Sequence, residues 1–453
     1  MTHQRIFKFP NTIPSWYIGH MAKAIKEIQS KLNQIDLIIE TRDARLPLSS
    51  INPKFEKLIQ THSNNRDQER EQEYDQGNDQ RRTIKKSLPS RLIVYNKKDL
   101  ADPRLEKPLK EAFAKSGQRV LFTNTRLDQD IKSVLYQSIE IVKSRYHSTG
   151  PLTSSDINDQ SKNHHHRNQS DSLSKGFKIM VCGMPNVGKS SLLNALRRVG
   201  CQKGKTASEA PMPGHTRSIG GMVKILEACK MSYGKSVYMI DTPGIMPIYL
   251  GQGDEASAIA FKIAITAGIK DSLFDSFDLS SYLLHILIQR YSILPHTPNE
   301  ISQTLSLNSS PDLTLVSSNP NLELPIEDFL KSISIRIKAL EKGAIPNLEI
   351  ASQYLLKSFR DGKFGRWTLD ELGQDEVDMD LGLTDSKEIQ TNSNSTSIDF
   401  HSRVFHRVDQ FLRSDDHEKF QSQTAIKMNE RRKNKQIQRS RSLSNLQKRR
   451  SKG

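Results

Sequence analysis

A short glycine-rich segment, residues 183–190, has the residue types that bind phosphate groups. It reads Gly-Met-Pro-Asn-Val-Gly-Lys-Ser, follows an apolar run and precedes residues that favour a helix, which is the context that a phosphate-binding loop requires. The glycines allow backbone N–H groups to turn toward a triphosphate, Lys189 can reach the outer phosphates, and the Ser190 hydroxyl can ligate Mg²⁺. The segment therefore predicts binding of a nucleoside triphosphate together with magnesium.

A second motif, Asp-Thr-Pro-Gly at residues 241–244, ends another apolar run. At the end of a strand, Asp241 can hold the metal while the backbone N–H of Gly244 faces the γ-phosphate. Such a tetrapeptide alone is an ordinary turn. After a phosphate-binding loop, it predicts the second half of a triphosphate site.

A third motif, Asn-Lys-Lys-Asp at residues 96–99, indicates which base is bound. It lies at the end of the run 91–95, where the Asp99 carboxylate can accept hydrogen bonds from the guanine N1–H and exocyclic amine. Adenine lacks this pair of donors, and leaving buried polar groups unpaired can cost a factor of about 10⁴ to 10⁵ in selectivity. The three motifs together predict GTP as the ligand.

These motifs need strands to position them, and five apolar runs supply candidates. Such runs, separated by helical patterns, are typical of strands buried on both faces of a parallel sheet, so we expect an α/β fold. They occupy residues 35–40, 91–96, 119–124, 177–183 and 236–244. Two polar segments, about 62–90 and 150–175, lack a hydrophobic period, and we interpret them as flexible insertions.

The pattern changes after residue 256, where apolar residues recur at the three- and four-residue spacing of helices. From residue 373 the chain is acidic and then basic, with too little apolar content to form a core. We expect a short basic extension at 1–12, a nucleotide-binding domain at 13–250, an all-helical domain at 251–372 and a disordered tail at 373–453.

The charge is concentrated at the two ends of the chain. The formal net charge is +16; residues 427–453 hold 11 Lys and Arg with one acidic residue, and residues 1–26 hold four with none. These ends are the expected contacts for RNA or for an acidic membrane surface. Three cysteines are too few for a disulfide framework, and no run approaches the about 18 to 20 apolar residues of a membrane span. Secreted disulfide-rich and membrane-spanning classes are therefore disfavoured.

The order of the motifs is unusual, because the guanine motif precedes the phosphate-binding loop, whereas ordinary small GTPases begin with that loop. In this order the chain resembles the circularly permuted GTPases of the YlqF type, and more narrowly the mitochondrial ribosome-associated GTPase 1 family. Supporting motifs are Trp-Tyr-Ile-Gly-His-Met-Ala-Lys-Ala at 16–24, Asp-Ala-Arg at 43–45, Leu-Pro-Leu-Ser-Ser-Ile-Asn-Pro at 46–53 and Phe-Arg-Asp-Gly-Lys-Phe-Gly at 359–365. The resemblance implies a P-loop GTPase domain with circularly permuted motifs, followed by a small helical domain and a basic tail.

The resemblance adds residues to the predicted site. It implies a second base-contacting loop at Asn124 and Thr125, a switch threonine at Thr216, and a K⁺-binding side chain at Asn186. The predicted Mg²⁺ ligands are Ser190, Thr216 and Asp241. The predicted nucleotide contacts are Asn96, Lys97, Lys98, Asp99, Asn124, Thr125, Gly183, Asn186, Val187, Gly188, Lys189, Ser190, Ser191 and Gly244.

The residue after the Asp-Thr-Pro-Gly motif bears on hydrolysis. Many GTPases place there a Gln that orients the attacking water, but this chain has Ile245, whose apolar side chain cannot hold water. The resemblance instead implies His20, within Gly-His-Met, as a participant in hydrolysis; alternatively, His20 caps or packs the first helix. Ile18 stands where the family usually has Pro. The predicted catalytic residues are His20, Lys189 and Thr216.

The function implied by the resemblance is assembly of the large ribosomal subunit. The expected activity is GTP hydrolysis that is slow until a ribosomal subunit assists, with rRNA and not DNA as the nucleic-acid partner. The expected location is the mitochondrial matrix, with peripheral contact to the inner membrane. Two alternatives stay open: the same activity in the nucleus, nucleolus or cytosol, and an RNA-binding scaffold that holds GTP with negligible turnover.

Overall fold

The computed structural model describes residues 7–10, 19–52, 55, 90–148, 176–207, 220–247, 250, 253–290, 305, 326–372 and 400–413. Apart from Ser90, the two predicted insertions lie outside the described residues. Within the described ranges, the helices are too short or too polar to cross a membrane.

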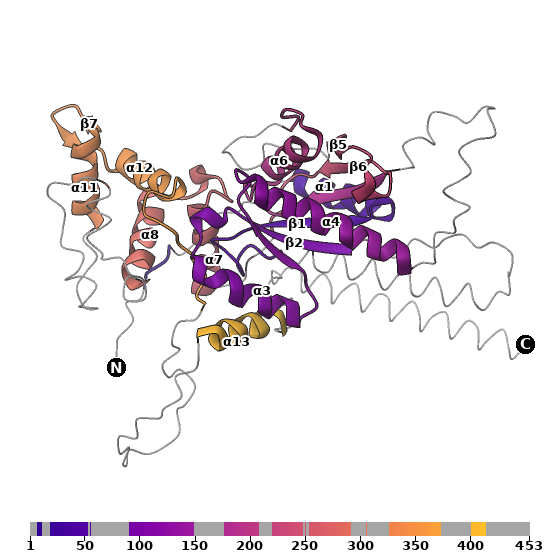
Figure 1. The fold of residues 1–453 in the computed structure, drawn as a ribbon. Helices are drawn as coiled ribbons and strands as arrows, with labels where there is room; N and C mark the ends of the chain where they lie inside the picture. The colour runs from indigo at the N-terminus through magenta and orange to yellow at the C-terminus, as the bar shows by residue number, and fades with distance from the viewer. Residues whose placement is uncertain are drawn as a thin grey trace, which may run out of the picture.

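A six-stranded sheet forms the centre of the nucleotide-binding domain, in the order β3-β2-β1-β4-β6-β5 (Figure 1). The strands are β1 (Leu37–Asp43), β2 (Ser90–Asn96), β3 (Val120–Thr123), β4 (Phe177–Cys182), β5 (Met222–Leu226) and β6 (Val237–Asp241). All neighbours are parallel except β5 and β6. The five predicted strands and the α/β fold are confirmed. Strand β5 was not predicted, because it is a half-exposed edge strand and lacks a continuous apolar run.

Helices cover both faces of the sheet, because successive residues of a strand point to opposite sides. On one face, α4 (Asp128–Ser148) and α6 (Lys189–Cys201) pack on residues such as Ile179 and Val181. On the other face, α1 (Gly19–Lys31) packs on Met180 and Cys182. Helix α3 (Glu106–Lys115) packs on Ile93 and Tyr95. Short 3₁₀ helices are η1 (Leu32–Gln34), η2 (Lys98–Leu100), η3 (Pro103–Leu105), η5 (Lys230–Ser232) and η6 (Asp271–Leu273).

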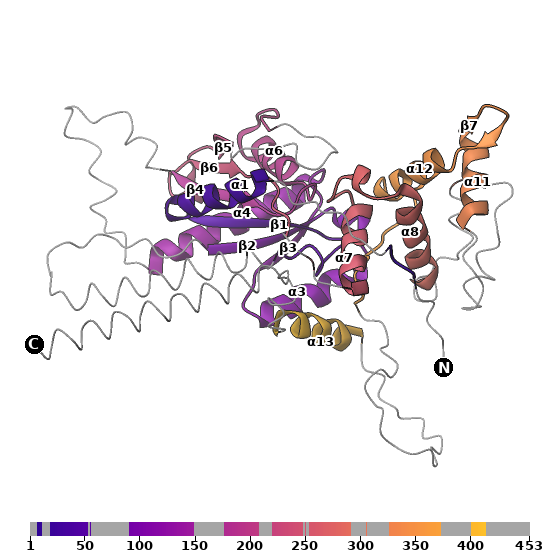
Figure 2. The same cartoon turned by 180° about the vertical axis from the view of Figure 1, so that it is seen from behind.

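A second, mainly helical unit lies beside the sheet (Figures 1 and 2). Its helices are α7 (Gly253–Ile265), α8 (Ser276–Arg290), α11 (Ile326–Ile337) and α12 (Leu348–Arg360), which share one apolar core. The unit is not all-helical as predicted. Strands β7 (Leu340–Glu341) and β8 (Ile345–Pro346) form a small antiparallel hairpin at its tip, which is too short to leave a periodic pattern in the sequence.

The N-terminal residues 7–10 contact this helical unit. The ring of Phe7 lies 4.9 Å from that of Tyr282, and the ring of Phe9 lies 5.3 Å from that of Phe261, measured between centroids. The sequence predicted only a short basic extension at residues 1–12. The two aromatic side chains instead add to the apolar core of the helical unit.

An additional helix, α13 (Phe400–Arg413), packs against α3 (Figures 1 and 2). Val404 and Val408 are fully buried there, and the Lys115 Nζ lies 4.0 Å from the centre of the Phe405 ring. We expected residues 373–453 to be disordered throughout. Residues 400–413 instead form a helix that packs on the GTPase domain. The polar composition of the long tail hid a short amphipathic segment with apolar residues four positions apart.

Candidate nucleotide-binding site

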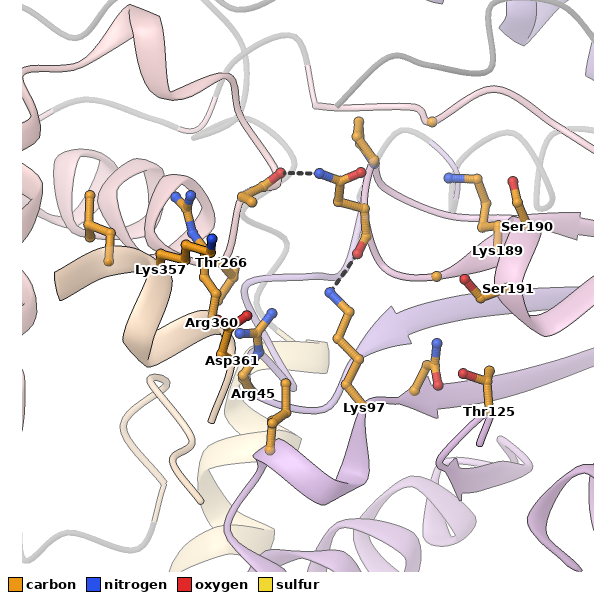
Figure 3. A pocket seen from close by; sticks show the side chains of 18 of the residues that line it. Arg45, Lys97, Thr125, Lys189, Ser190, Ser191, Thr266, Lys357, Arg360 and Asp361 are labelled. Carbon is orange, nitrogen blue, oxygen red and sulfur yellow. Dashed lines mark hydrogen bonds between the residues drawn. The ribbon is translucent and has the colours of Figure 1, made fainter. Parts of the chain in front are cut away.

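The predicted motifs converge at the carboxyl edge of the sheet, where the parallel strands β1, β2, β4 and β6 end together. A cavity of about 1600 Å³ opens at this edge. The predicted residues that line it are Asn96, Lys97, Asp99, Asn124, Thr125, Asn186, Gly188, Lys189, Ser190, Ser191 and Gly244 (Figure 3). Gly183, Val187, Asp241 and Lys98 are not among the residues that line the cavity, and the Lys98 ammonium forms an ion pair with Asp130. The 96–99 turn and the 183–190 loop therefore share one cavity.

The phosphate-binding loop depends on glycine at two positions. Gly183 has φ of +140° and Gly188 has φ of +93°, which side chains rarely allow. A Cβ atom on Gly188 would lie 2.2 Å from the Asn96 Nδ2, and one on Gly183 would lie 2.1 Å from the Thr41 carbonyl oxygen. The loop can keep this shape only without side chains at both positions.

Asn96 joins the guanine motif to the phosphate-binding loop. Its Nδ2 donates a hydrogen bond of 3.0 Å to the carbonyl oxygen of Val187. The side chain is 2% exposed, and its Oδ1 has no hydrogen-bond partner among the described residues. Asn96 therefore holds the two motifs together and is not itself directed at a base.

Lys97 also crosses between the two motifs. Its backbone is left-handed (φ 61°), and its Nζ donates to the Asn186 carbonyl oxygen at 2.6 Å and to the Asp43 carboxylate at 3.0 Å. Asp43 is paired with Arg45 as well. Burial alone would raise the pKa of Asp43, but Arg45 and Lys97 outweigh it and hold that pKa well below its usual range. The Asp43 carboxylate therefore stays ionised, and its contacts with Arg45 and Lys97 hold the turn against the loop.

Lys189 is buried in the floor of the cavity. Its Nζ donates to the Met184 carbonyl oxygen at 2.7 Å, within its own loop, and the side chain is only 6% exposed. Burial lowers the pKa of Lys189 from 10.5 to about 8, although Asp241 partly opposes this change. The ammonium group is thus poorly solvated, which favours binding of an anion at the mouth of the loop.

Ser190 and Asp241 form the group that could hold magnesium. The Ser190 Oγ donates to the Asp241 Oδ2 at 2.7 Å, and the Asp241 Oδ1 has no hydrogen-bond partner among the described residues. Burial raises the pKa of Asp241, so a cation beside the carboxylate would relieve its desolvation. One hydroxyl and one carboxylate fit Mg²⁺, which commonly takes its other ligands from phosphates and water.

The base side of the cavity contains a link that the sequence analysis missed. The Asp130 carboxylate accepts from the Lys98 Nζ at 2.7 Å and from the Asn124 backbone N–H at 2.8 Å. It therefore connects the 96–99 turn to the 123–125 loop. Asp130 lies in the first turn of α4, where acidic residues are common for helix stability alone, so its type and position gave no functional signal.

The helical unit supplies the opposite wall of the cavity. The Asn186 Nδ2 donates to the carbonyl oxygen of Ala267 at 2.8 Å, just beyond α7. Arg360 of α12 binds the carbonyl oxygens of Ala264 and Ile265, each at 2.8 Å, and so caps the end of α7. Lys357 and Asp361 line the same wall. None of these contacts from the helical unit was predicted from the sequence.

Two of the predicted catalytic side chains, those of His20 and Thr216, lie outside the described residues. His20 is in α1, but its side chain lies outside the described part of the structure, and Thr216 lies wholly outside it. Ile245 is described: its backbone N–H donates to the Gly183 carbonyl oxygen at 3.1 Å, and its side chain is buried in the core beneath α1. The residue after Gly244 therefore does not face the cavity.

These features define a P-loop GTPase whose motifs follow one another in a circularly permuted order. A family model described as "50S ribosome-binding GTPase" matches residues 178–303. The chain is 28% identical to Mitochondrial ribosome-associated GTPase 1 of Mus musculus, over 79% of this chain and 90% of the relative. It is 29% identical to Mitochondrial GTPase 1 of Schizosaccharomyces japonicus, over 82% and 94%. It is 27% identical to Ribosome biogenesis GTPase A of Bacillus cereus, over 81% and 97%. Along about four-fifths of its length, the chain is therefore similar to ribosome-associated and ribosome-biogenesis GTPases.

Proposed function

We propose that the chain is an assembly factor that binds the large ribosomal subunit in mitochondria and couples its GTP state to late maturation of that subunit. The names of its relatives support ribosome assembly. The observation that carries the coupling is the hydrogen bond from Asn186, in the phosphate-binding loop, to Ala267 in the helical unit. A change at the phosphates can therefore move the unit that is proposed to contact rRNA.

In this proposal, Asp99 reads the guanine base. Asp99 lines the cavity on the side of Asn124 and Thr125, so its carboxylate can accept from N1–H and the exocyclic amine while the 124–125 loop flanks the base. Lys97 and Lys98 are engaged with Asp43 and Asp130. Both lysines therefore hold the turn in place, and their charges are not directed at the phosphates.

The phosphates bind the backbone N–H groups of the 183–190 loop. Lys189 exchanges its hydrogen bond to the Met184 carbonyl for the outer phosphates, which restores the solvation that burial removed. Ser190, Asp241 and Thr216 would hold Mg²⁺, which when bound neutralises charge on the transferred phosphoryl group. Gly244 lines the same cavity, and its backbone N–H would face the γ-phosphate.

Positioning of the attacking water is assigned to His20, since Ile245 is buried, and turnover is slow until a ribosomal subunit assists. The proposed K⁺ ligand is the side-chain oxygen of Asn186, whose amide nitrogen is already held by Ala267. Potassium would supply positive charge near the phosphates. Comparing the rate of GTP hydrolysis in KCl and in NaCl at equal ionic strength tests the proposed K⁺ site. Equal rates in the two salts would contradict it.

We place the protein in the mitochondrial matrix, with a peripheral contact to the inner membrane, and propose that its basic ends bind rRNA. Since Phe7 and Phe9 pack in the helical unit, deleting residues 1–12 would also damage the fold. We propose that the basic residues of this segment also direct the protein to mitochondria, and replacing Arg5 and Lys8 with Gln tests this role without removing Phe7 and Phe9. We expect the tagged native protein to be found in mitochondria and the tagged variant to be lost from them. If both proteins are found in the nucleus or the cytosol, the result favours ribosome biogenesis outside mitochondria.

Sedimentation tests the proposed function most simply. The full-length protein should co-sediment with mitochondrial large subunits in the presence of a non-hydrolysable GTP analogue and dissociate in GDP. A Lys189→Met variant, which loses the phosphate-binding ammonium, should show no such difference. Equal co-sedimentation of the native protein in both nucleotides would contradict GTP-timed binding, and tight GTP binding without phosphate release beside subunits would favour the scaffold alternative.

A further inference from the structure

The chain leaves α12 and returns to the GTPase domain through residues 362–370, which we call the strap. The backbone N–H of Trp367 donates to the Leu100 carbonyl oxygen at 2.8 Å, and the Thr368 Oγ1 accepts from the Asp102 backbone N–H at 3.3 Å. Leu100 follows Asp99 directly, and Asp102 is three positions after it. The strap therefore binds the backbone immediately beyond the proposed guanine-reading residue.

The start of the strap also packs closely against the same turn. Gly362 has φ of +76°, and a Cβ atom there would lie 2.6 Å from the Leu100 Cδ2. Trp367 and Leu369 are almost completely buried, at 1% and 0% exposure. The turn and the strap thus form one packed layer, in which a displacement of either displaces the other.

The far end of the strap is anchored beside β1. The Leu369 N–H donates to the Arg45 carbonyl oxygen at 2.7 Å. The Asp370 carboxylate accepts from the backbone N–H groups of Leu48 and Ser49, at 2.7 and 2.9 Å. Asp370 is 5% exposed, and a buried carboxylate that binds two N–H groups fixes the local backbone strongly.

Asp99 consequently lies between two attachments. On one side, Lys97 ties the turn to the phosphate-binding loop through the Asn186 carbonyl. On the other side, Leu100 is tied to the strap, which is continuous with α12 of the helical unit. A short turn with a left-handed residue would have many conformations without such attachments.

We propose that the strap is the element that positions Asp99 for guanine, so that guanine selectivity depends on docking of the helical unit against the GTPase domain. Thr368 is a positioning residue that binds the backbone of the 97–102 segment directly. Asp370 is a positioning residue that acts on the same segment indirectly, by anchoring the end of the strap at Leu48 and Ser49. This inference rests on the proposed reading of guanine by Asp99. It adds a second connection, on the base side, to the Asn186–Ala267 connection on the phosphate side.

Inosine triphosphate is the probe that separates positioning from general folding. ITP lacks the exocyclic amine, so Asp99 can accept two hydrogen bonds from GTP and one from ITP. A carboxylate that is held in place gains the full binding free energy of the second hydrogen bond, whereas a mobile carboxylate gains only part of it. We expect the native protein to prefer GTP over ITP by about 10- to 100-fold, the value of one hydrogen bond to a charged group.

The test measures Kd for GTP and ITP on the full-length protein and its variants. The ratio of the two Kd values does not depend on the fraction of protein that is correctly folded. In Asp370→Ala and Thr368→Val, we expect the preference for GTP to fall to about threefold or less. Asp370→Asn keeps an oxygen that can accept from both N–H groups and should restore most of the preference.

Asp36→Ala is the matched control, because Asp36 is equally buried and accepts from the Lys178 backbone N–H at 2.7 Å, at the opposite edge of the sheet. Its GTP-to-ITP ratio should equal that of the native protein. The strap proposal is overturned if Asp370→Ala and Thr368→Val weaken GTP and ITP by the same factor while Asp99→Ala loses the preference. If Asp99→Ala keeps the preference, the base-reading role of Asp99 fails, and the strap proposal fails with it.

Discussion

Raising the pH from 7 to 9 should weaken GTP binding, because Lys189 loses its proton in the nucleotide-free protein. Burial lowers the pKa of Lys189 to about 8 when its described partner is the Met184 carbonyl. Bound phosphates favour the charged form and raise this pKa again. Binding above pH 8 must therefore take up a proton, and affinity falls as protons become scarce.

The size of the effect follows from this pKa. Lys189 is about nine-tenths protonated at pH 7 and about one-tenth protonated at pH 9, so Kd for GTP should rise about tenfold over this interval. Below pH 7 the curve should be flat. In the nucleotide-free protein, the pKa of Lys189 is about 8 in the folded state and 10.5 in the unfolded state. Between these values the unfolded state binds more protons, so the free energy of unfolding should increase as the pH rises from about 8 toward 10.5.

Equilibrium binding of GTP at fixed ionic strength measures this dependence, and calorimetry in buffers of different ionisation enthalpy measures the proton uptake. Lys189→Met is the control, since it should bind GTP weakly and should lack the tenfold rise in Kd between pH 7 and pH 9. Any titration of the base itself appears in both proteins and cancels. A constant Kd in the native protein, or an equal slope in Lys189→Met, would refute the assignment of the titrating group.

Two further predictions concern the loop and the last helix. Gly188→Ala should weaken GTP binding at least tenfold, because its Cβ would lie 2.2 Å from the Asn96 Nδ2; Gly117→Ala has a similar positive φ of +72° and no atom within 4 Å, and should leave GTP affinity unchanged. Equal effects of the two changes would contradict the role of this contact. Replacing Val404 and Val408 together with Ala removes four buried methyl groups, or about 3 kcal/mol, so hydrogen exchange should accelerate in α3 but not in α12. Unchanged exchange in α3 would show that α13 does not protect it.

The sequence predicted the convergence of the motifs because its physical basis is local. Each motif ends an apolar run, and parallel strands bring their carboxyl ends to one edge. The Asn96 side chain, 3.0 Å from the Val187 carbonyl oxygen, places two motifs in contact although about ninety positions separate them along the chain. Glycine at 183 and 188 was likewise predictable, because only a special backbone shape requires it there.

The remaining parts of the site depend on contacts that leave no local pattern. Asp370 belonged to a run of acidic residues and gave no sign that it binds the backbone of residues 48 and 49. Ala267 contributes only its carbonyl oxygen, which any residue possesses. Residues 400–413 have apolar residues at four-residue spacing. In a single short helix this pattern is weak beside the polar composition of the whole tail, which predicts disorder.

The identification of the 96–99 turn as the guanine-reading element is tested most directly by Asp99→Asn. Xanthine carries a C2 carbonyl in place of the guanine amine, so an Asn amide can donate to it where a carboxylate is repelled. We predict that Asp99→Asn prefers XTP over GTP, in binding and in turnover, while the native protein prefers GTP. Undiminished GTP binding by Asp99→Asn, without any gain for XTP, would contradict the assignment.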